Sequence, residues 1–135
     1  LGQAIQLYRE NVQPSEYLDQ PYVSMGVPAV VAQTDAEAEY LATSAYQRVL
    51  GLMRGQSLKL KAPVTTMDGL WSPAEKMSVD NFYAMAQIGS PNTVKAGLEM
   101  LLEKYDVDEF IFTCDIYDTD KRIENFELLM NIKNA

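Results

Sequence analysis

Apolar and polar positions along this chain follow two patterns, one typical of helices and one typical of buried strands. Apolar residues three or four positions apart predict helices over 4–10, 35–54, 73–87, from 91 onward, and over 118–132. Continuous apolar runs predict strands over 22–32 and 108–114, because a strand covered on both faces has no polar side. The expected order is therefore helix, strand, three helices, strand, helix.

Short polar signals mark the ends of these helices. Thr34 with Glu37, and Ser72 with Glu75, have the spacing of a capping box, in which two side chains satisfy free backbone N–H groups. Gly55 is expected to end the 35–54 helix in the left-handed conformation. Pro28 cannot donate to a strand ladder, so a bulge or irregularity is expected there.

Helical spacing also predicts which side chains are buried. The 35–54 helix is expected to bury Ala38, Leu41, Ala45, Val49, Leu52 and Met53. The helix after Pro91 is expected to bury Val94, Gly97, Leu98, Leu101 and Leu102. The closing helix is expected to bury Ile123, Phe126, Leu129 and Met130. The stretch 56–70 has no sustained period and is predicted to be a long loop, functional or mobile.

Two buried strands joined by a long helical crossover must run parallel. Two strands do not make a complete parallel sheet, so the pattern predicts a slice of an α/β protein, with residues 1–135 as a single segment. The chain opens with Leu1-Gly2-Gln3 inside a helical pattern, and no capping side chain precedes it. We therefore expect it to be a piece of a larger protein.

Composition narrows the possible chemistry. The net charge is −8, and the 11 basic residues are dispersed, which argues against binding to nucleic acid. No apolar run approaches the roughly 20 residues that cross a bilayer, so no membrane partner is expected. The single cysteine, Cys114, suits a reducing compartment, and we expect a cytoplasmic protein. Histidine is absent, which removes the commonest general base and most zinc sites.

The sequence singles out no catalytic residue. Cys114 lacks an activating histidine or adjacent cation, so it is expected to be a buried, inert thiol. Asp115, Asp118 and Asp120 do not have the spacing of a calcium loop, so no metal site is expected, and the last two should cap the closing helix. The segment 89–91 offers free N–H groups at a helix start, but capping by its serine is preferred over phosphate binding.

Four stretches of the chain resemble one family in their order and spacing. They are residues 27–38, 67–76, 88–94 and 115–118. The chain resembles the C-terminal part of the luciferase-like flavin-dependent monooxygenases, which are (β/α)8 TIM barrels. The resemblance implies that 22–32 is the seventh strand and 108–114 the eighth. The position of Asp115 is often histidine in the most similar subgroup, so a proton-handling role there is in doubt for this chain.

The resemblance implies that reduced FMN and O2 oxidise a small organic substrate, with a separate flavin reductase as partner and a homo-oligomeric assembly. Chemistry in such a barrel lies at the carboxyl ends of the strands. The pocket residues expected there, together with one from the long loop, are Val31, Ala32, Gln33, Thr113, Asp115, Tyr117 and Trp71. Small apolar residues at these ends would let a flat flavin ring pack closely, and barrel core and loop packing is the alternative explanation for them.

Family analogy places the flavin phosphate on earlier strands, so we expect this chain alone to be inactive. Two alternatives remain open at this point. One is a related barrel that uses the deazaflavin F420 as a hydride carrier. The other is a non-catalytic α/β fragment that associates with itself through exposed strand edges.

Three arginines of the predicted helices are also candidate charged site residues. Arg9, Arg48 and Arg54 are all expected at exposed helix positions, where they need no further explanation.

Overall fold

The structure of the chain is a computed structural model, which describes residues 1–57 and 59–134. Its elements are α1 (Gly2–Asn11), β1 (Ser24–Val31), α2 (Asp35–Met53), α3 (Pro73–Phe82), β2 (Gln87–Gly89), α4 (Pro91–Tyr105), β3 (Glu109–Thr113) and α5 (Thr119–Asn134). The three strands are parallel and lie in the order β2-β1-β3. The predicted α/β class and the parallel direction of the strands are confirmed. Leu58, within the predicted 56–70 loop, lies outside the described residues.

The short strand β2 was not predicted. The helix expected over 73–87 ends at Phe82, and Gln87–Gly89 pairs with residues 29–31 of β1. Three residues are too few to show an alternating pattern, so the local sequence carries no strand signal. Pairing with the buried half of β1 fixes their conformation instead.

Strand β1 runs unbroken through Pro28, so the expected bulge is wrong. Residues 24–28 of β1 pair with β3, whereas residues 29–31 pair with β2. Pro28 therefore lies where the strand changes partner. The ladder to β3 ends at the residue that has no N–H to donate.

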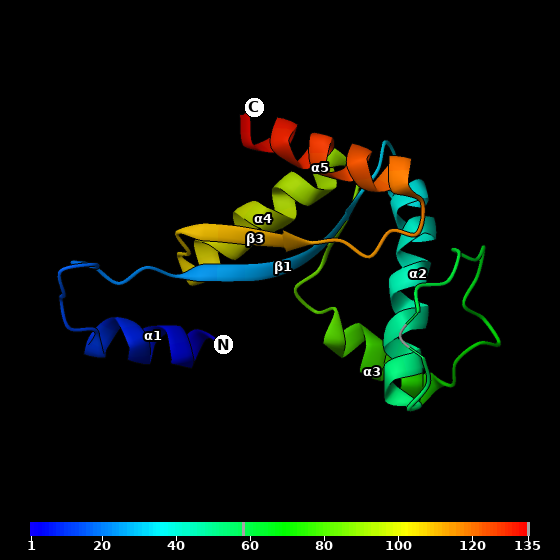
Figure 1. The fold of residues 1–135 in the computed structure, drawn as a ribbon, viewed down its shortest axis with the longest axis horizontal. Coiled ribbons are helices and arrows are strands. Elements are labelled where there is room, and N and C mark those ends of the chain that lie inside the picture. The colour runs from blue at the N-terminus through cyan, green and yellow to red at the C-terminus, as the bar shows by residue number, and fades with distance from the viewer. Residues whose placement is uncertain (58, 135) are drawn as a thin grey trace.

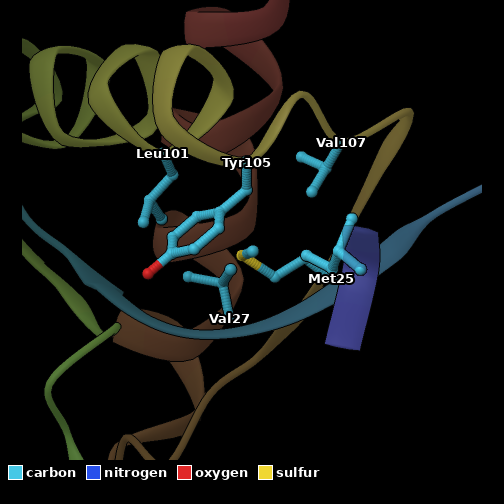
Figure 2. Close-up of a cluster of buried hydrophobic side chains, with 6 residues drawn as sticks. Met25, Val27, Leu101, Tyr105 and Val107 are labelled. Atoms are coloured by element: carbon cyan, nitrogen blue, oxygen red, sulfur yellow. The ribbon is translucent and has the colours of Figure 1, made fainter. Parts of the chain in front are cut away.

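One face of the sheet is covered by α4 and α5, which lie on the same side of β1 and β3 in Figure 1. Alternate β1 side chains point to this face, and all are at most 6% exposed: Met25, Val27, Ala29 and Val31. Figure 2 shows Met25 and Val27 packed against Leu101 and Tyr105 of α4. This layer is the main hydrophobic core of the chain.

The opposite face of the sheet is open over much of its length. Its side chains are Ser24, Gly26 and Pro28 of β1 and their register partners Glu109, Ile111 and Thr113 of β3. Ile111 is 53% exposed, although it lies in the middle of a strand. Towards the carboxyl end α2 covers this face, where Val30 and Ala32 pack against Leu41.

The predicted caps are partly confirmed. Thr34 accepts from the N–H of Glu37 at 3.1 Å, but the Glu37 carboxylate pairs with Lys121 at 2.6 Å, so this capping box is only half formed. At the start of α3 the box is complete, as predicted, since Ser72 and Glu75 each accept from the other's backbone N–H. Gly55 adopts the predicted left-handed conformation with φ +66°.

Several predicted buried positions in α2 and α4 are wrong at the helix ends. Leu52 and Met53 of α2 are 48% and 44% exposed, and Leu50 is buried in their place. Leu102 of α4 is 43% exposed. Leu102 lies beside an open groove together with Leu98 and Phe110, whereas its neighbours Leu101 and Tyr105 face the sheet.

Of the four residues predicted to be buried on α5, Leu129 is buried as predicted and the other three are exposed. Ile123, Phe126 and Met130 are 42–54% exposed, and Asn125 is fully buried. The side-chain oxygen of Asn125 accepts from the N–H of Val31 at 2.6 Å. This bond orients α5 on the sheet, and a polar residue at the centre of a buried face gives no apolar signal in the sequence.

Candidate functional site

The carboxyl ends of the parallel strands point towards α2, where the open face of the sheet ends (Figure 1). A narrow pocket lies there between the strands and the helices. Its walls include Pro28 of β1, Thr113 and Asp115 at the end of β3, Tyr46 of α2 and Tyr83 after α3. The free volume of about 10 Å³ is enough for about one water molecule.

An ion pair fixes one side of this pocket. The Arg48 guanidinium donates from Nε at 2.9 Å and from Nη2 at 2.6 Å, and both bonds end on Oδ2 of Asp115. About one third of each side chain is exposed, so the pair is partly shielded from water. Charge-assisted bonds of this kind are stronger than neutral ones and hold both groups in place. They join α2 to the segment that leaves β3.

Two tyrosines, Tyr46 and Tyr83, also line the pocket, and their raised pKa values keep both phenols neutral at physiological pH. Burial raises the pKa of Tyr83 to about 12, and the Asp115 charge contributes in the same direction. Burial also raises the pKa of Tyr46, together with the nearby Glu39 carboxylate. The Tyr83 hydroxyl donates to the backbone carbonyl of Ala45 at 3.2 Å. Neither ring is therefore suited to act as a base.

Trp71 lies beside Tyr46. Its ring centroid is 6.1 Å from that of Tyr46, which is in turn 5.7 Å from that of Tyr83. Trp71 packs against a buried cluster that includes Val49 and Met67, and both tyrosines pack against the same cluster. It supports the pocket from outside and connects the long loop to it.

The loop between α2 and α3 is attached along α2. The Thr43 hydroxyl accepts from the N–H of Val64 at 2.9 Å, and the Gln47 side chain donates to the carbonyl of Ala62 at 3.0 Å. Met67 is 6% exposed and inserts into the cluster beneath Trp71. The prediction that this loop is mobile stays a prediction, and these contacts identify what such motion would have to break.

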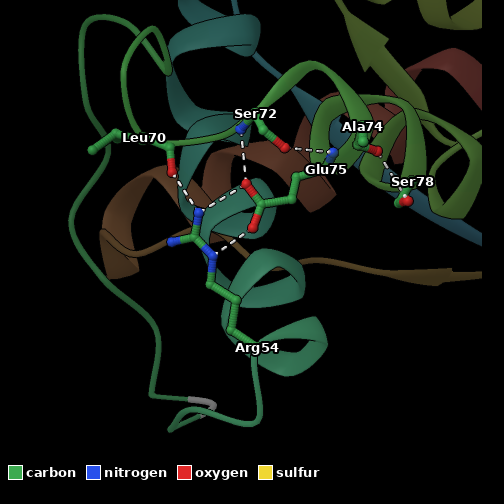
Figure 3. Close-up of polar contacts among 6 residues, drawn as sticks. All are labelled: Arg54, Leu70, Ser72, Ala74, Glu75 and Ser78. Atoms are coloured by element: carbon green, nitrogen blue, oxygen red, sulfur yellow. Dashed lines mark hydrogen bonds and ion pairs between the residues drawn. The ribbon is translucent and has the colours of Figure 1, made fainter.

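The two ends of the same loop are joined by hydrogen bonds and an ion pair from Arg54 to Leu70 and Glu75, which we call the clasp (Figure 3). Arg54 donates to both carboxylate oxygens of Glu75, at 2.7 and 2.9 Å, and to the carbonyl of Leu70 at 3.0 Å. Glu75 also accepts from the N–H of Ser72 at 2.7 Å. The Arg54 guanidinium, followed by that N–H, lowers the pKa of Glu75 to about 2.

The structure brings together only part of the predicted pocket set. Thr113 and Asp115 line the pocket. Val31 and Ala32 are each 1% exposed, the first beneath α4 and α5 and the second against α2. Within the described chain these two side chains therefore meet helices and not open space.

The other three predicted residues lie around the pocket. Gln33 donates to Glu124 of α5 at 2.8 Å. Tyr117 is 53% exposed beyond the end of β3. Trp71 packs against the Tyr46 ring, which fits the loop-packing explanation better than contact with a bound molecule. None of the three is among the residues that line the pocket.

The segment 89–91 is occupied by a carboxylate of the chain itself. Asp35 accepts from the N–H of Ser90 at 2.6 Å, and this bond is the largest cause of the lowered pKa of Asp35. The Ser90 side chain does not cap α4, contrary to expectation. Asp35 therefore fills the place where a phosphate would bind a helix start.

The remaining candidates are structural. Burial raises the pKa of the Cys114 thiol, so the thiolate is disfavoured. Asp118 caps α5, because it accepts from the N–H of Lys121 at 2.9 Å. Within residues 1–57 and 59–134, no group of three or more His, Cys, Asp or Glu side chains could hold a metal ion. No helix in the same residues combines the length and apolar character needed to cross a membrane.

Sequence reasoning missed two pocket residues, Tyr46 and Tyr83, and the arginine that binds Asp115 beside them. Arg48 was expected at an exposed position, yet its head group is engaged by Asp115 across 67 positions of sequence. Tyr46 and Tyr83 carry no motif. A usable signal is that Tyr46 directly follows the buried Ala45 on α2, which places it at the edge of the apolar face.

Comparison with known proteins gives relatives over nearly the whole chain. An uncharacterised protein of Bacillus subtilis, YvbT, is 39% identical over 96% of this chain, and a luciferase-like monooxygenase of Escherichia coli K12 is 36% identical over 98%. The chain spans about 40% of the length of the curated relatives that it matches. No family model matches it.

A solved structure shares the arrangement of the elements. The crystal structure of apo-MsnO8 matches 98% of this chain with a TM-score of 0.73 at 18% identity, and the match covers 41% of that protein. At this level of identity the likeness concerns the fold alone. By sequence, the chain is homologous over 98% of its length to the luciferase-like monooxygenases, which confirms the resemblance stated above.

Proposed function

We propose that this chain is part of a flavin-dependent oxidoreductase, in which it supplies one wall of the site where a small organic substrate is oxidised. The observation that supports this most strongly is its 36% identity over 98% of its length to a luciferase-like monooxygenase. In this proposal reduced FMN and O2 supply the oxidation chemistry. The chain itself binds, orients and shields the reacting molecules from water.

The open face of the sheet supports the proposed barrel. In a closed barrel one face of each strand packs on helices and the other faces the barrel interior. Here α4 and α5 cover one face, whereas Gly26, Pro28 and Ile111 are on the other with little above them. We propose that this open face is the inward surface of the C-terminal portion of a (β/α)8 barrel.

The open face fits the ring of a flavin. A Cβ built on Gly26 would meet nothing within 4 Å, so there is free space above this part of β1. Pro28 and Thr113 extend the same surface towards the pocket. These small residues would face the flat ring and exclude water from its side.

The described residues do not fit the flavin phosphate. The open face carries no lysine or arginine among residues 24–31 and 109–113. Arg48 is already paired with Asp115, and the start of α4 is filled by Asp35. We therefore propose that the phosphate is held by residues outside this chain, and that the chain alone has no activity.

A chimera tests this proposal directly. The 133 matching residues of the Escherichia coli luciferase-like monooxygenase are replaced by this chain, with the parent enzyme as the matched control. We expect the purified chimera to consume O2 in the presence of reduced FMN and a candidate substrate, and the isolated chain to consume none beyond the flavin background. A folded chimera that turns over with F420 and not with FMN would favour the deazaflavin alternative.

The self-associating alternative is tested separately. Strands β2 and β3 are the two edges of the described sheet, and exposed parallel edges favour association. Sedimentation of the isolated chain measures this. A stable dimer of the chain together with an inactive but folded chimera would favour a non-catalytic, self-associating role over the enzymatic one.

A further inference from the structure

The ion pair at the pocket leaves one carboxylate oxygen available. Both Arg48 donors bind Oδ2 of Asp115, at 2.9 and 2.6 Å. Among residues 1–57 and 59–134, no side chain or backbone group donates a hydrogen bond to Oδ1. Arg48 therefore fixes the orientation of the carboxylate, while Oδ1 keeps its capacity to accept.

The pocket that Asp115 lines has room for a single small polar group. Its free volume of about 10 Å³ corresponds to about one water molecule. A hydroxyl or an amino group takes up similar space and can replace such a water if it makes the same hydrogen bonds. The rest of a bound molecule would extend along the open sheet face beside Pro28 and Thr113.

The surrounding charges favour a neutral donor over an anion. The carboxylate and the guanidinium compensate each other at 2.6 Å, so no net positive charge remains for an anion. The nearby tyrosines are neutral, since burial raises the pKa of Tyr83 to about 12. An anionic group placed at Oδ1 would meet the negative charge of Asp115, whose partner Arg48 is already engaged.

We propose that Asp115, oriented by Arg48, selects bound molecules that carry a hydroxyl or N–H donor and rejects anions. This inference rests on the proposed function, because it names the substrate class of the same site. Asp115 contacts the bound molecule directly, and Arg48 is a positioning residue that acts through it.

Three probes that share one ring test this selectivity. Benzyl alcohol carries a donor, benzoate carries an anion, and toluene carries neither. Each is titrated into the ¹⁵N-labelled chain, and amide shifts of Tyr46, Tyr83 and Asp115 are followed by NMR. We expect benzyl alcohol to bind at least about tenfold more tightly than toluene or benzoate, the range that one hydrogen bond to a charged group provides.

The variant Asp115→Asn makes the test sharper. It removes the negative charge and leaves Arg48 without its partner, so we expect benzyl alcohol to lose its preference and benzoate to gain one. Asp120→Asn, an exposed change in the first turn of α5, is the matched control and should behave as the unmodified chain. The conservative variant Arg48→Lys should keep part of the alcohol preference, because a cation still holds Asp115.

The outcomes separate this inference from the proposed function. Absence of benzyl alcohol binding, equal binding of benzoate, or an unchanged preference in Asp115→Asn would each overturn the inference, provided that the amide spectrum shows a folded chain. None of these results bears on whether the chimera oxidises a substrate with flavin. An inactive chimera beside a chain that selects alcohols would instead reject the flavin proposal.

Discussion

The attachment of the long loop to α2 makes a quantitative prediction for Thr43→Val. The Thr43 side chain is 7% exposed, accepts from the N–H of Val64 at 2.9 Å and donates to the carbonyl of Tyr40 at 2.6 Å. Valine has nearly the same shape but no hydroxyl, so the change removes these bonds and leaves the packing almost unaltered. The N–H of Val64 then has no acceptor as long as the loop stays on α2.

The magnitude follows from the hydrogen bond to the loop. A net loss of about 0.5–1.5 kcal/mol for one such bond raises the open population of the loop by about 2- to 12-fold. Most of this cost should appear as local opening, because Val64 belongs to the loop and not to the sheet. The midpoint of global unfolding should therefore change less than the opening of the loop.

Limited trypsin digestion measures this opening, because Lys59 and Lys61 are exposed within the loop. When opening is fast relative to cleavage, the cleavage rate follows the open population. We expect Thr43→Val to be cut about 2- to 12-fold faster, and Thr65→Val, an exposed change in the same loop, to be cut at the original rate. Equal rates for all three chains would refute the view that Thr43 holds the loop.

Three further predictions concern caps, glycines and pH. Ser72→Ala removes the first half of a complete capping box and should lower the free energy of unfolding by about 0.5–2 kcal/mol in urea, whereas Ser78→Ala in the same helix should cost clearly less. Gly89→Ala should destabilise the fold, because φ is +154° and the new Cβ would lie 2.7 Å from a side-chain carbon of Thr93. Gly26→Ala is the control, since its new Cβ would meet nothing within 4 Å. Equal melting temperatures for the two variants would contradict this. The folded pKa of Glu75, about 2, lies below its ordinary value of 4.5, so its contribution to stability is present above pH 4.5 and is lost as pH falls towards 2. Urea midpoints that do not fall over this range would show that the clasp contributes nothing.

The fold was predictable where local signals and burial agree. Strand β1 reads as a continuous apolar run because both of its faces are covered in its second half. The start of α3 is defined by Ser72 and Glu75, which act within four residues of each other. In both cases the information lies within the segment itself.

The fold was not predictable where distant contacts decide. Gln87–Gly89 becomes a strand only because it pairs with β1 more than fifty residues away. The orientation of α5 depends on the buried Asn125 and its bond to Val31, whereas apolar spacing favoured the face with Ile123 and Phe126. No local pattern contains either partner.

The candidate site also has residues that the sequence could predict and residues that only distant contacts bring together. The rule that chemistry lies at the carboxyl ends of parallel strands selected Thr113 and Asp115, and both line the narrow pocket of the structure. The same rule also selected Val31 and Ala32, whose side chains are buried against helices. Arg48 could not be found from sequence, because only the folded chain brings it to Asp115.

An FMN titration tests the central claim most directly, because the claim is that this chain forms only one wall of a flavin site. Flavin fluorescence and the emission of Trp71 are followed for the isolated chain and for the chimera with the Escherichia coli enzyme, after circular dichroism has shown that both are folded. The account predicts saturable, micromolar binding by the chimera and none by the chain alone. Micromolar binding by the chain alone, or no binding by a folded chimera, would contradict it.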